Sequence, residues 1–207
     1  MTPLAFYWAK LTHNEEKLAA FGIRHADLLV QLSGKSVALV GNARALGQTN
    51  LGAQIDSADI VIRINSAPMT TAATHGTRTD WLAISLPAPY EILTNRAPKI
   101  VLWMTPKRKR LARYLIEFAS FYLNPQSRWQ SLADRLGARP TTGLMMIDLL
   151  GASQAREINL YGFDFFTSLS LSGDRSAAQV PHDFANERDF VLDLMNRDAR
   201  FKLHKMD

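Results

Sequence analysis

Two short stretches of the sequence have residue types that could hold a phosphate group. The first is Gly41-Asn42, which follows the apolar run at residues 37–40. A glycine there permits a sharp turn and a close approach of the backbone to a ligand. The second is the PTTG stretch at residues 140–143, directly ahead of the apolar residues 144–150. Threonine hydroxyls at this place are expected to cap the free N–H groups of a helix start, and a helix start also attracts anions. Each stretch also has a purely structural interpretation, as a turn that ends a strand or as a helix cap.

His182 and Glu187 lie close to the expected start of the last helix. Asp183 has the position of an N-cap, and Glu187 has that of a first-turn acid, which the positive end of the helix dipole favours. On position alone, His182 is a loop histidine just outside the cap, and the residues by themselves assign it no chemistry.

The hydrophobic pattern predicts the elements that must position these residues. Apolar runs of strand length occur at residues 37–40, 59–65, 80–84, 99–104 and 157–163. Helices are expected at residues 14–32, 107–123, 127–136 and 144–150, and a last one after residue 183. This alternation predicts the α/β class: a Rossmann-like, mostly parallel sheet with helices on both faces. Such sheets bind ligands at their carboxyl edge.

The glycines after the first strand do not form a dinucleotide fingerprint. Gly41, Gly47 and Gly52 lack the G-x-G-x-x-G spacing, and the sequence contains no P-loop pattern. An NAD-dependent enzyme is therefore disfavoured.

Composition favours one folded domain with acidic partners. The 207 residues suffice for a single α/β domain over residues 1–207, and they are too few for two comfortable ones. The chain has no cysteine, which excludes disulfides, thiolate nucleophiles and cysteine-ligated zinc. Its net charge of +5 favours nucleotides, phosphorylated sugars, nucleic acid or an anionic bilayer. Neither a signal peptide nor a membrane span is recognisable, so we expect a soluble, cytoplasmic protein.

A basic cluster opens the expected helix at residues 107–123. It consists of Lys107, Arg108, Lys109 and Arg110. Beside an aromatic and aliphatic helix face, such a cluster can lie on an anionic membrane or contact nucleic acid. The alternative is a solvated cationic turn ahead of a core helix.

Three motifs in order resemble the eukaryotic-type sialyltransferase family. Its large motif resembles VALVGN at residues 37–42, the stretch at 52–68 and GTRTD at 76–80. Its small motif resembles PTTG at residues 140–143 through LYGF at 160–163, and its very small motif, H-x-x-x-x-E, matches residues 182–187. The chain thus looks like a bacterial, soluble member, a single-domain variant of the GT-A glycosyltransferase fold.

The resemblance implies a glycosyltransferase that moves a sialic acid or a related keto-sugar acid, such as Kdo, from a CMP-activated donor to a glycan hydroxyl. It implies inversion, no metal, and no cofactor besides the donor substrate. His182 matches the general base, and Glu187 is its supporting partner in the motif. The positions that match donor-binding residues are Gly41, Asn42, Asn65, Thr141, Thr142 and Gly143.

The acceptor implied by the resemblance is a glycan or a glycolipid. A glycolipid precursor made at the inner membrane face would fit a peripheral contact through the basic cluster, and nucleic acid is then not the expected partner. Carboxylate recognition could use Arg63, Arg78, Arg175 or a backbone turn. The alternative function is a non-catalytic module that binds a nucleotide or nucleic acid with the same fold.

The chain departs from the family pattern at two places. Val37 and Ala155 stand where the family has the cysteines of its usual disulfide, so an apolar contact is expected there. The family's short His-Tyr motif has no counterpart between Asp164 and Pro181, where Arg175 could substitute for a phosphate-contacting histidine.

Overall fold

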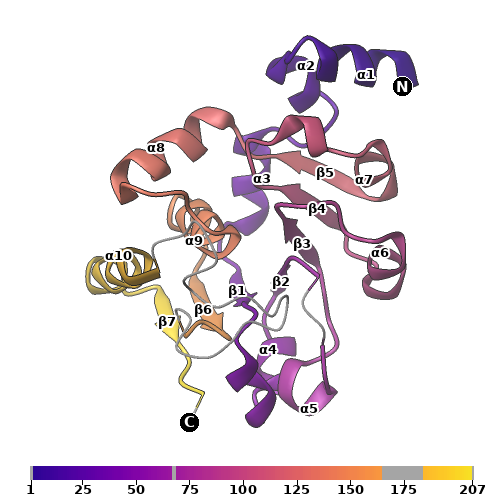
Figure 1. Cartoon of the computed structure of the whole chain (residues 1–207). Helices are drawn as coiled ribbons and strands as arrows, with labels where there is room; N and C mark the ends of the chain where they lie inside the picture. Colours follow the sequence, from indigo (N-terminus) through magenta and orange to yellow (C-terminus); the bar gives the residue numbers. More distant parts are fainter. Residues whose placement is uncertain (1, 67–68, 165–183, 207) are drawn as a thin grey trace.

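The strands form one twisted parallel sheet at the centre of the molecule (Figure 1). The computed structural model describes residues 2–66, 69–164 and 184–206. Within these residues the sheet has seven strands in the order β5-β4-β3-β2-β1-β6-β7, and every neighbouring pair is parallel. The strands are β1 (Ser36–Val40), β2 (Ile60–Ile64), β3 (Trp81–Ile84), β4 (Ile100–Trp103), β5 (Ser120–Leu123), β6 (Glu157–Tyr161) and β7 (Phe201–Leu203). The predicted Rossmann-like α/β architecture is confirmed.

Helices cover both faces of this sheet, as predicted (Figure 1). One face packs against α3 (His25–Leu32), α8 (Gln126–Leu136), α9 (Thr142–Gly151) and α10 (Phe184–Arg197). The other face packs against α1 (Pro3–Leu11), α2 (Glu15–Ala19), the 3₁₀ turn η1 (Arg44–Gln48), α4 (Gly52–Asp56), α6 (Tyr90–Arg96) and α7 (Arg113–Phe118). Two further short elements are α5 (Ala72–His75) and the 3₁₀ turn η2 (Arg108–Arg110).

The central strands are continuously apolar because both of their faces are buried. In β1, Val37 and Leu39 point into the core beneath α9, while Ala38 and Val40 point into the core beneath α4. Val37 and Ala155, the positions of the family's cysteines, are both buried in the same apolar core. This agrees with the expectation that apolar packing stands in place of the bridge.

The prediction of a single helix at residues 14–32 is wrong, because the structure has two helices there, α2 and α3. Gly22 packs against β5 so closely that a Cβ there would lie 2.3 Å from the carbonyl oxygen of Phe121. The next residue, Ile23, donates its N–H to that same carbonyl at 2.7 Å. The backbone therefore bonds to the sheet at the point where a continuous helix would have bonded to itself.

The helix expected at residues 107–123 is also wrong. This stretch contains η2, α7 and the edge strand β5. In β5, Phe121 and Tyr122 point to opposite cores, the alternation of a strand. A short aromatic run has no periodicity long enough to reveal this. The short C-terminal strand β7 was also not predicted.

Several residues that match the large motif form a hydrogen-bonded structural frame between β2 and β3. Arg63, buried on β2, donates to the carbonyl oxygens of Arg78 at 2.8 Å and His75 at 2.7 Å. Burial lowers the pKa of Arg63 to about 10. Arg78 donates to the Asp56 carbonyl at 2.6 Å and forms an ion pair with Asp80 at 2.6 Å.

Candidate functional site

The strand order has a switch point between β1 and β6. These two strands are neighbours, yet the chain continues from β1 to β2 on one side and from β6 to β7 on the other. Such a switch point at the carboxyl ends of parallel strands is where open α/β sheets bind ligands. The predicted site residues are therefore expected at this switch point.

Gly41, at the end of β1, lies directly on the turn that ends β6. Its N–H donates to the carbonyl of Tyr161 at 2.7 Å, and the N–H of Ala43 donates to the carbonyl of Gly162 at 3.1 Å. A Cβ on Gly41 would lie 2.3 Å from the Gly162 carbonyl oxygen. Gly162 itself has a φ of 68°, which glycine adopts without strain. The two turns thus form one unit, and sequence reasoning did not single out Gly162 as part of it.

Thr141 and Thr142 begin α9, as the capping pattern predicts. Thr141 accepts a hydrogen bond on its hydroxyl from the N–H of Leu144 at 3.1 Å. The Thr141 N–H and hydroxyl in turn donate to the two carboxylate oxygens of Glu187, each at 2.7 Å. Glu187 lies in the first turn of α10 and is 4% exposed. It is therefore a support for the α9 start and not merely a dipole-favoured surface acid.

Three polar side chains meet where β2, β3 and α9 come together. Ser85, just after β3, shares a hydrogen bond of 2.7 Å with the hydroxyl of Thr142. That hydroxyl also lies 3.4 Å from the amide oxygen of Asn65, just after β2. Asn65 has a φ of 53°, a left-handed conformation that asparagine tolerates better than most residues. Ser85 was missed, although a polar residue directly after a predicted strand is a usable signal.

The ring of Phe163 joins the two glycine-containing stretches. One edge of this ring lies 3.2 Å from the place of a Cβ on Gly41, and another lies 2.8 Å from the place of a Cβ on Gly143. The structure therefore brings together residues 41 and 143, which are far apart in the sequence. Of the other predicted residues with described positions, Asn65, Thr141, Thr142 and Glu187 adjoin the same α9 start, and Asn42 directly follows Gly41.

His182 and Arg175 lie outside the described residues. Arg63 and Arg78, which were considered for carboxylate recognition, are described. Their guanidinium groups bind backbone carbonyls and Asp80 within the structural frame. These contacts give both residues a structural role, and carboxylate recognition by either of them stays a prediction.

The four residues of the basic cluster do not all lie on the surface. Arg108 is only 6% exposed, and it donates to the carbonyls of Thr105 and Asn124 and to Glu15. Lys107, Lys109 and Arg110 are exposed. Arg108 is thus a structural residue, and the cationic surface has three members from this cluster, not four.

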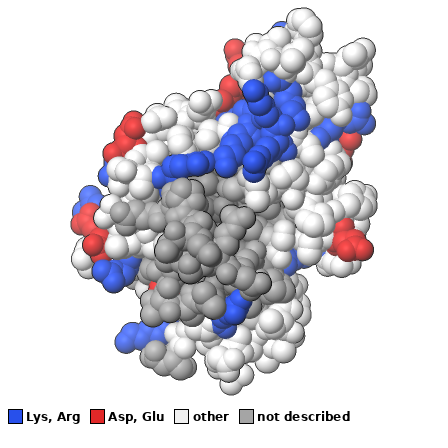
Figure 2. All heavy atoms as spheres, in the orientation of Figure 1, with Lys and Arg blue, Asp and Glu red and all other residues white. Residues whose placement is uncertain are grey.

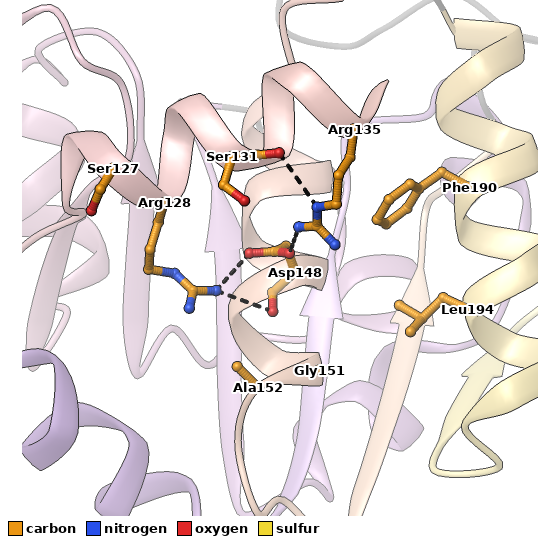
Figure 3. A pocket seen from close by; sticks show the side chains of 9 residues that line it. All are labelled: Ser127, Arg128, Ser131, Arg135, Asp148, Gly151, Ala152, Phe190 and Leu194. Carbon is orange, nitrogen blue, oxygen red and sulfur yellow. Dashed lines mark hydrogen bonds and ion pairs between the residues drawn. The ribbon is translucent and has the colours of Figure 1, made fainter. Parts of the chain in front are cut away.

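A cavity of about 430 Å³ lies between α8, α9 and α10, away from the α9 start (Figure 3). Arg128 and Arg135 point toward Asp148 from one side, and Phe190 and Leu194 line the other. Because both guanidinium groups are paired with the same carboxylate, the cavity has the character of an ion-paired groove between helices. None of the predicted donor residues lines it.

Two features are absent from the described parts of the chain. No group of three or more His, Cys, Asp or Glu side chains there is arranged to hold a metal ion. None of the described helices has the length and apolar character needed to cross a membrane.

Solved structures of other proteins share this fold. The chain is similar in fold to a mammalian sialyltransferase, with a TM-score of 0.61 and 19% identity over 89% of this chain and 80% of the other. It is also similar to the sialyltransferase CstII from Campylobacter jejuni, solved with the substrate analogue cytidine-5'-monophosphate, with a TM-score of 0.54 and 15% identity over 83% of this chain and 79% of the other. No curated protein sequence matches the chain. The family model for glycosyltransferase family 29 (sialyltransferase) matches residues 6–119, more than half of the sequence. The chain therefore belongs to glycosyltransferase family 29, the sialyltransferases.

Proposed function

We propose that the protein is an inverting, metal-independent glycosyltransferase that moves a sialic acid, or a related keto-sugar acid such as Kdo, from a CMP-activated donor to a glycan hydroxyl. Its family makes it a sialyltransferase-like enzyme that uses a CMP-sugar. The observation that carries the proposal is the convergence of Gly41 and Gly143 on the Phe163 ring at the switch point of the sheet.

The start of α9 supports a phosphate site. The N–H groups of Leu144 and Met145 donate to Thr141. The N–H groups of Thr142 and Gly143 come earlier, where the helix offers no carbonyl to accept from them. The first N–H groups of a helix have no partner within it and lie at the positive end of its dipole. We assign these two groups to the donor phosphate, where they also stabilise the charge that develops on the leaving CMP.

The remaining donor residues would recognise the nucleoside. Asn42 follows the Gly41 turn, and Asn65 lies beside Thr142. An asparagine amide offers both donors and an acceptor, which suits the mixed polar edge of cytosine and the ribose hydroxyls. A crystal structure with CMP would assign each amide to its partner.

We propose His182 as the general base. The imidazole removes the proton of the acceptor hydroxyl while that oxygen attacks the anomeric carbon. The bond from this carbon to the CMP phosphate oxygen breaks, and its electron pair leaves with CMP. Attack opposite the leaving group inverts the configuration, and histidine suits this proton transfer because its usual pKa lies near working pH. Support comes from Glu187, whose bonds to Thr141 hold the start of α10, two positions after His182, beside the phosphate site.

We place the acceptor, a glycan or glycolipid, at the inner face of the membrane, in the cytoplasm. Lys107, Lys109 and Arg110 would contact anionic lipid there, because their side chains are exposed. Arg108 is left out of this contact, because it is buried.

A thermal-shift comparison of CMP, UDP and GDP tests the nucleotide class. A ligand that binds only the folded state raises the melting temperature, so we expect CMP to stabilise the protein more than the other two. His182→Ala should lower turnover of a CMP-sialic acid donor by roughly 10²–10⁴-fold and leave the CMP shift intact. His13→Asn is the matched control, because His13 is exposed with a φ of 53° that asparagine tolerates. Equal shifts with all three nucleotides would contradict the proposal, and an inactive protein with a CMP shift would favour the non-catalytic module.

A further inference from the structure

One face of α1 presents an uncovered stripe of large apolar side chains. Leu4, Tyr7, Trp8 and Leu11 are 81%, 55%, 61% and 74% exposed. Their spacing of three and four residues puts them on one side of the helix. Single exposed apolar residues are ordinary, but a contiguous row of four with an exposed tryptophan indicates a contact surface.

The exposure of this stripe is not the result of a loosely attached helix. On the opposite face of α1, Phe6 and Ala9 are buried in the core beneath β3 to β5. The Phe6 ring packs edge to face on Phe21 at 6.0 Å, and Lys10 donates to the carbonyl of Leu111 at 2.7 Å. The stripe is therefore held outward at a defined orientation.

Cationic side chains border the stripe. Lys10 ties α1 to the residue that follows η2, where Lys107, Lys109 and Arg110 are exposed. None of these three takes part in an ion pair within the described residues. Figure 2 shows Lys and Arg gathered in one blue patch directly below the lobe formed by α1 and α2.

We infer that the α1 stripe and this cationic patch together dock the protein on an anionic lipid bilayer. The apolar side chains would enter the boundary between headgroups and acyl chains, and the lysines and arginine would face lipid phosphates. Tryptophan is favoured at that depth because its ring is apolar and its N–H is polar. The charge pattern favours a bilayer over a second copy of the chain, because a symmetric dimer through the stripe would bring two cationic patches together.

The docked orientation would place the proposed donor site close to the membrane surface. Burial, and after it the positive charges of Arg139 and Arg110, lower the pKa of Lys107, and Arg139 directly precedes the PTTG stretch. The patch therefore extends from η2 to the approach to α9. This consequence rests on the proposed function, whereas docking itself does not.

The test uses the whole chain and vesicles of two compositions, phosphatidylcholine alone and phosphatidylcholine with one third phosphatidylglycerol. We expect co-sedimentation with the anionic vesicles, weaker binding to the neutral ones, and loss of binding as salt is added. Trp8 emission should shift to shorter wavelength on binding. Trp8→Phe should abolish that shift but keep the sedimentation, because Trp81 and Trp103 are buried in the core and Trp129 packs half-buried on the core of the other sheet face.

Two sets of variants separate the apolar from the cationic contribution. Leu4→Ser with Trp8→Ser and Leu11→Ser should lower partitioning by at least about tenfold. Lys107→Glu with Lys109→Glu and Arg110→Glu should do the same on anionic vesicles only, at roughly fivefold or more per residue.

The matched control is Val30→Ser with Leu192→Ser, which removes exposed apolar side chains (72% and 44% exposed) from other elements. We expect it to bind vesicles as the unchanged protein does. An unchanged protein that ignores anionic vesicles, or a control that loses as much binding as the stripe variant, overturns the inference. So does a dimer that dissociates in the stripe variant while vesicles are ignored, because the stripe then belongs to a second copy. A CMP thermal shift in the stripe variant reports on the donor site separately.

Discussion

Glu187 holds Thr141 with both of its carboxylate oxygens, one on the N–H and one on the hydroxyl, each at 2.7 Å. The two residues are 46 positions apart in the sequence. Because Thr141 caps α9 and Glu187 lies in the first turn of α10, this contact fixes the starts of two helices against each other. The proposed phosphate site lies at one of these starts, and the proposed base precedes the other by two residues in the sequence.

We expect Glu187→Gln to destabilise the fold and to weaken CMP binding. The amide can accept only one of the two hydrogen bonds, and a lost hydrogen bond to a buried charge costs roughly 1.5–3 kcal/mol. Urea unfolding and a CMP titration would measure the two effects. Glu117→Gln is the control, because its ion pair with Arg113 is exposed and should contribute only about 0.3–0.5 kcal/mol. Strictly additive effects of Glu187→Gln and Thr141→Val would contradict a direct coupling.

Gly41→Ala should separate the two turns that meet at the switch point of the sheet. The new Cβ would meet the Gly162 carbonyl at 2.3 Å, a backbone atom that cannot move alone. We expect a loss of roughly 1–3 kcal/mol in the free energy of unfolding and a weaker CMP thermal shift. Gly47→Ala is the matched control, since its nearest neighbours would lie at 3.9 Å. If both variants bind CMP as the unchanged protein does, the switch point is not the donor site.

Arg108→Ala should lower the free energy of unfolding more than any other substitution in the basic cluster. Its guanidinium bonds two backbone carbonyls and the carboxylate of Glu15. Removing one partner of a buried pair costs roughly 3–5 kcal/mol, and the partial exposure of Glu15 points to the lower end. Lys109→Ala, at an exposed position, should stay within about 0.5 kcal/mol. Differential scanning calorimetry of the two variants decides the matter, and similar melting temperatures would show that Arg108 is not structural.

Stability should fall as the pH falls below about 6.5, the ordinary pKa of histidine. Burial, helped by the charge of Arg63, lowers the pKa of His75, and burial lowers the pKa of His25 and His204 too. The unfolded chain then binds protons that the folded chain does not, so each such histidine removes up to roughly 1.4 kcal/mol per pH unit. The loss begins at the unfolded pKa and ends at the lower folded one.

His75→Gln isolates one of these contributions. We expect its unfolding free energy to fall less steeply than that of the unchanged protein between pH 6.5 and pH 5, by up to roughly one proton's slope. Measurements at pH 8, where histidines are neutral, give the difference that does not depend on protonation. Parallel curves for the two proteins would show that His75 is protonated equally in both states.

The sequence allowed the central sheet to be predicted and left its edges unrecognised. Strands β1 to β4 and β6 are buried on both faces, so each is an apolar run that needs no partner to be identified. Edge strand β5 is a four-residue run beside a helix, and β7 has three residues. Neither is long enough for periodicity to distinguish strand from helix.

Candidate site residues were predictable where the reason is local. Thr141 and Gly41 stand out because capping and turning are decided by near neighbours. The partnership of Thr141 with Glu187, and that of Thr142 with Ser85, depend on long-range packing that no local pattern records. Arg63 and Arg78 show that a charged residue in a motif can have structural contacts that no local pattern reveals.

The position of Arg108 has a further consequence for substrate choice. By bonding Glu15 of α2 and the carbonyls that follow β4 and β5, it fastens the N-terminal helices rigidly to the sheet. If α1 rests on lipid, the proposed donor site then lies at a fixed height above the membrane. The enzyme would therefore select acceptors whose sugar projects from its anchor by that height. Acceptors with spacers of graded length should therefore show one optimum, and Arg108→Ala should broaden it.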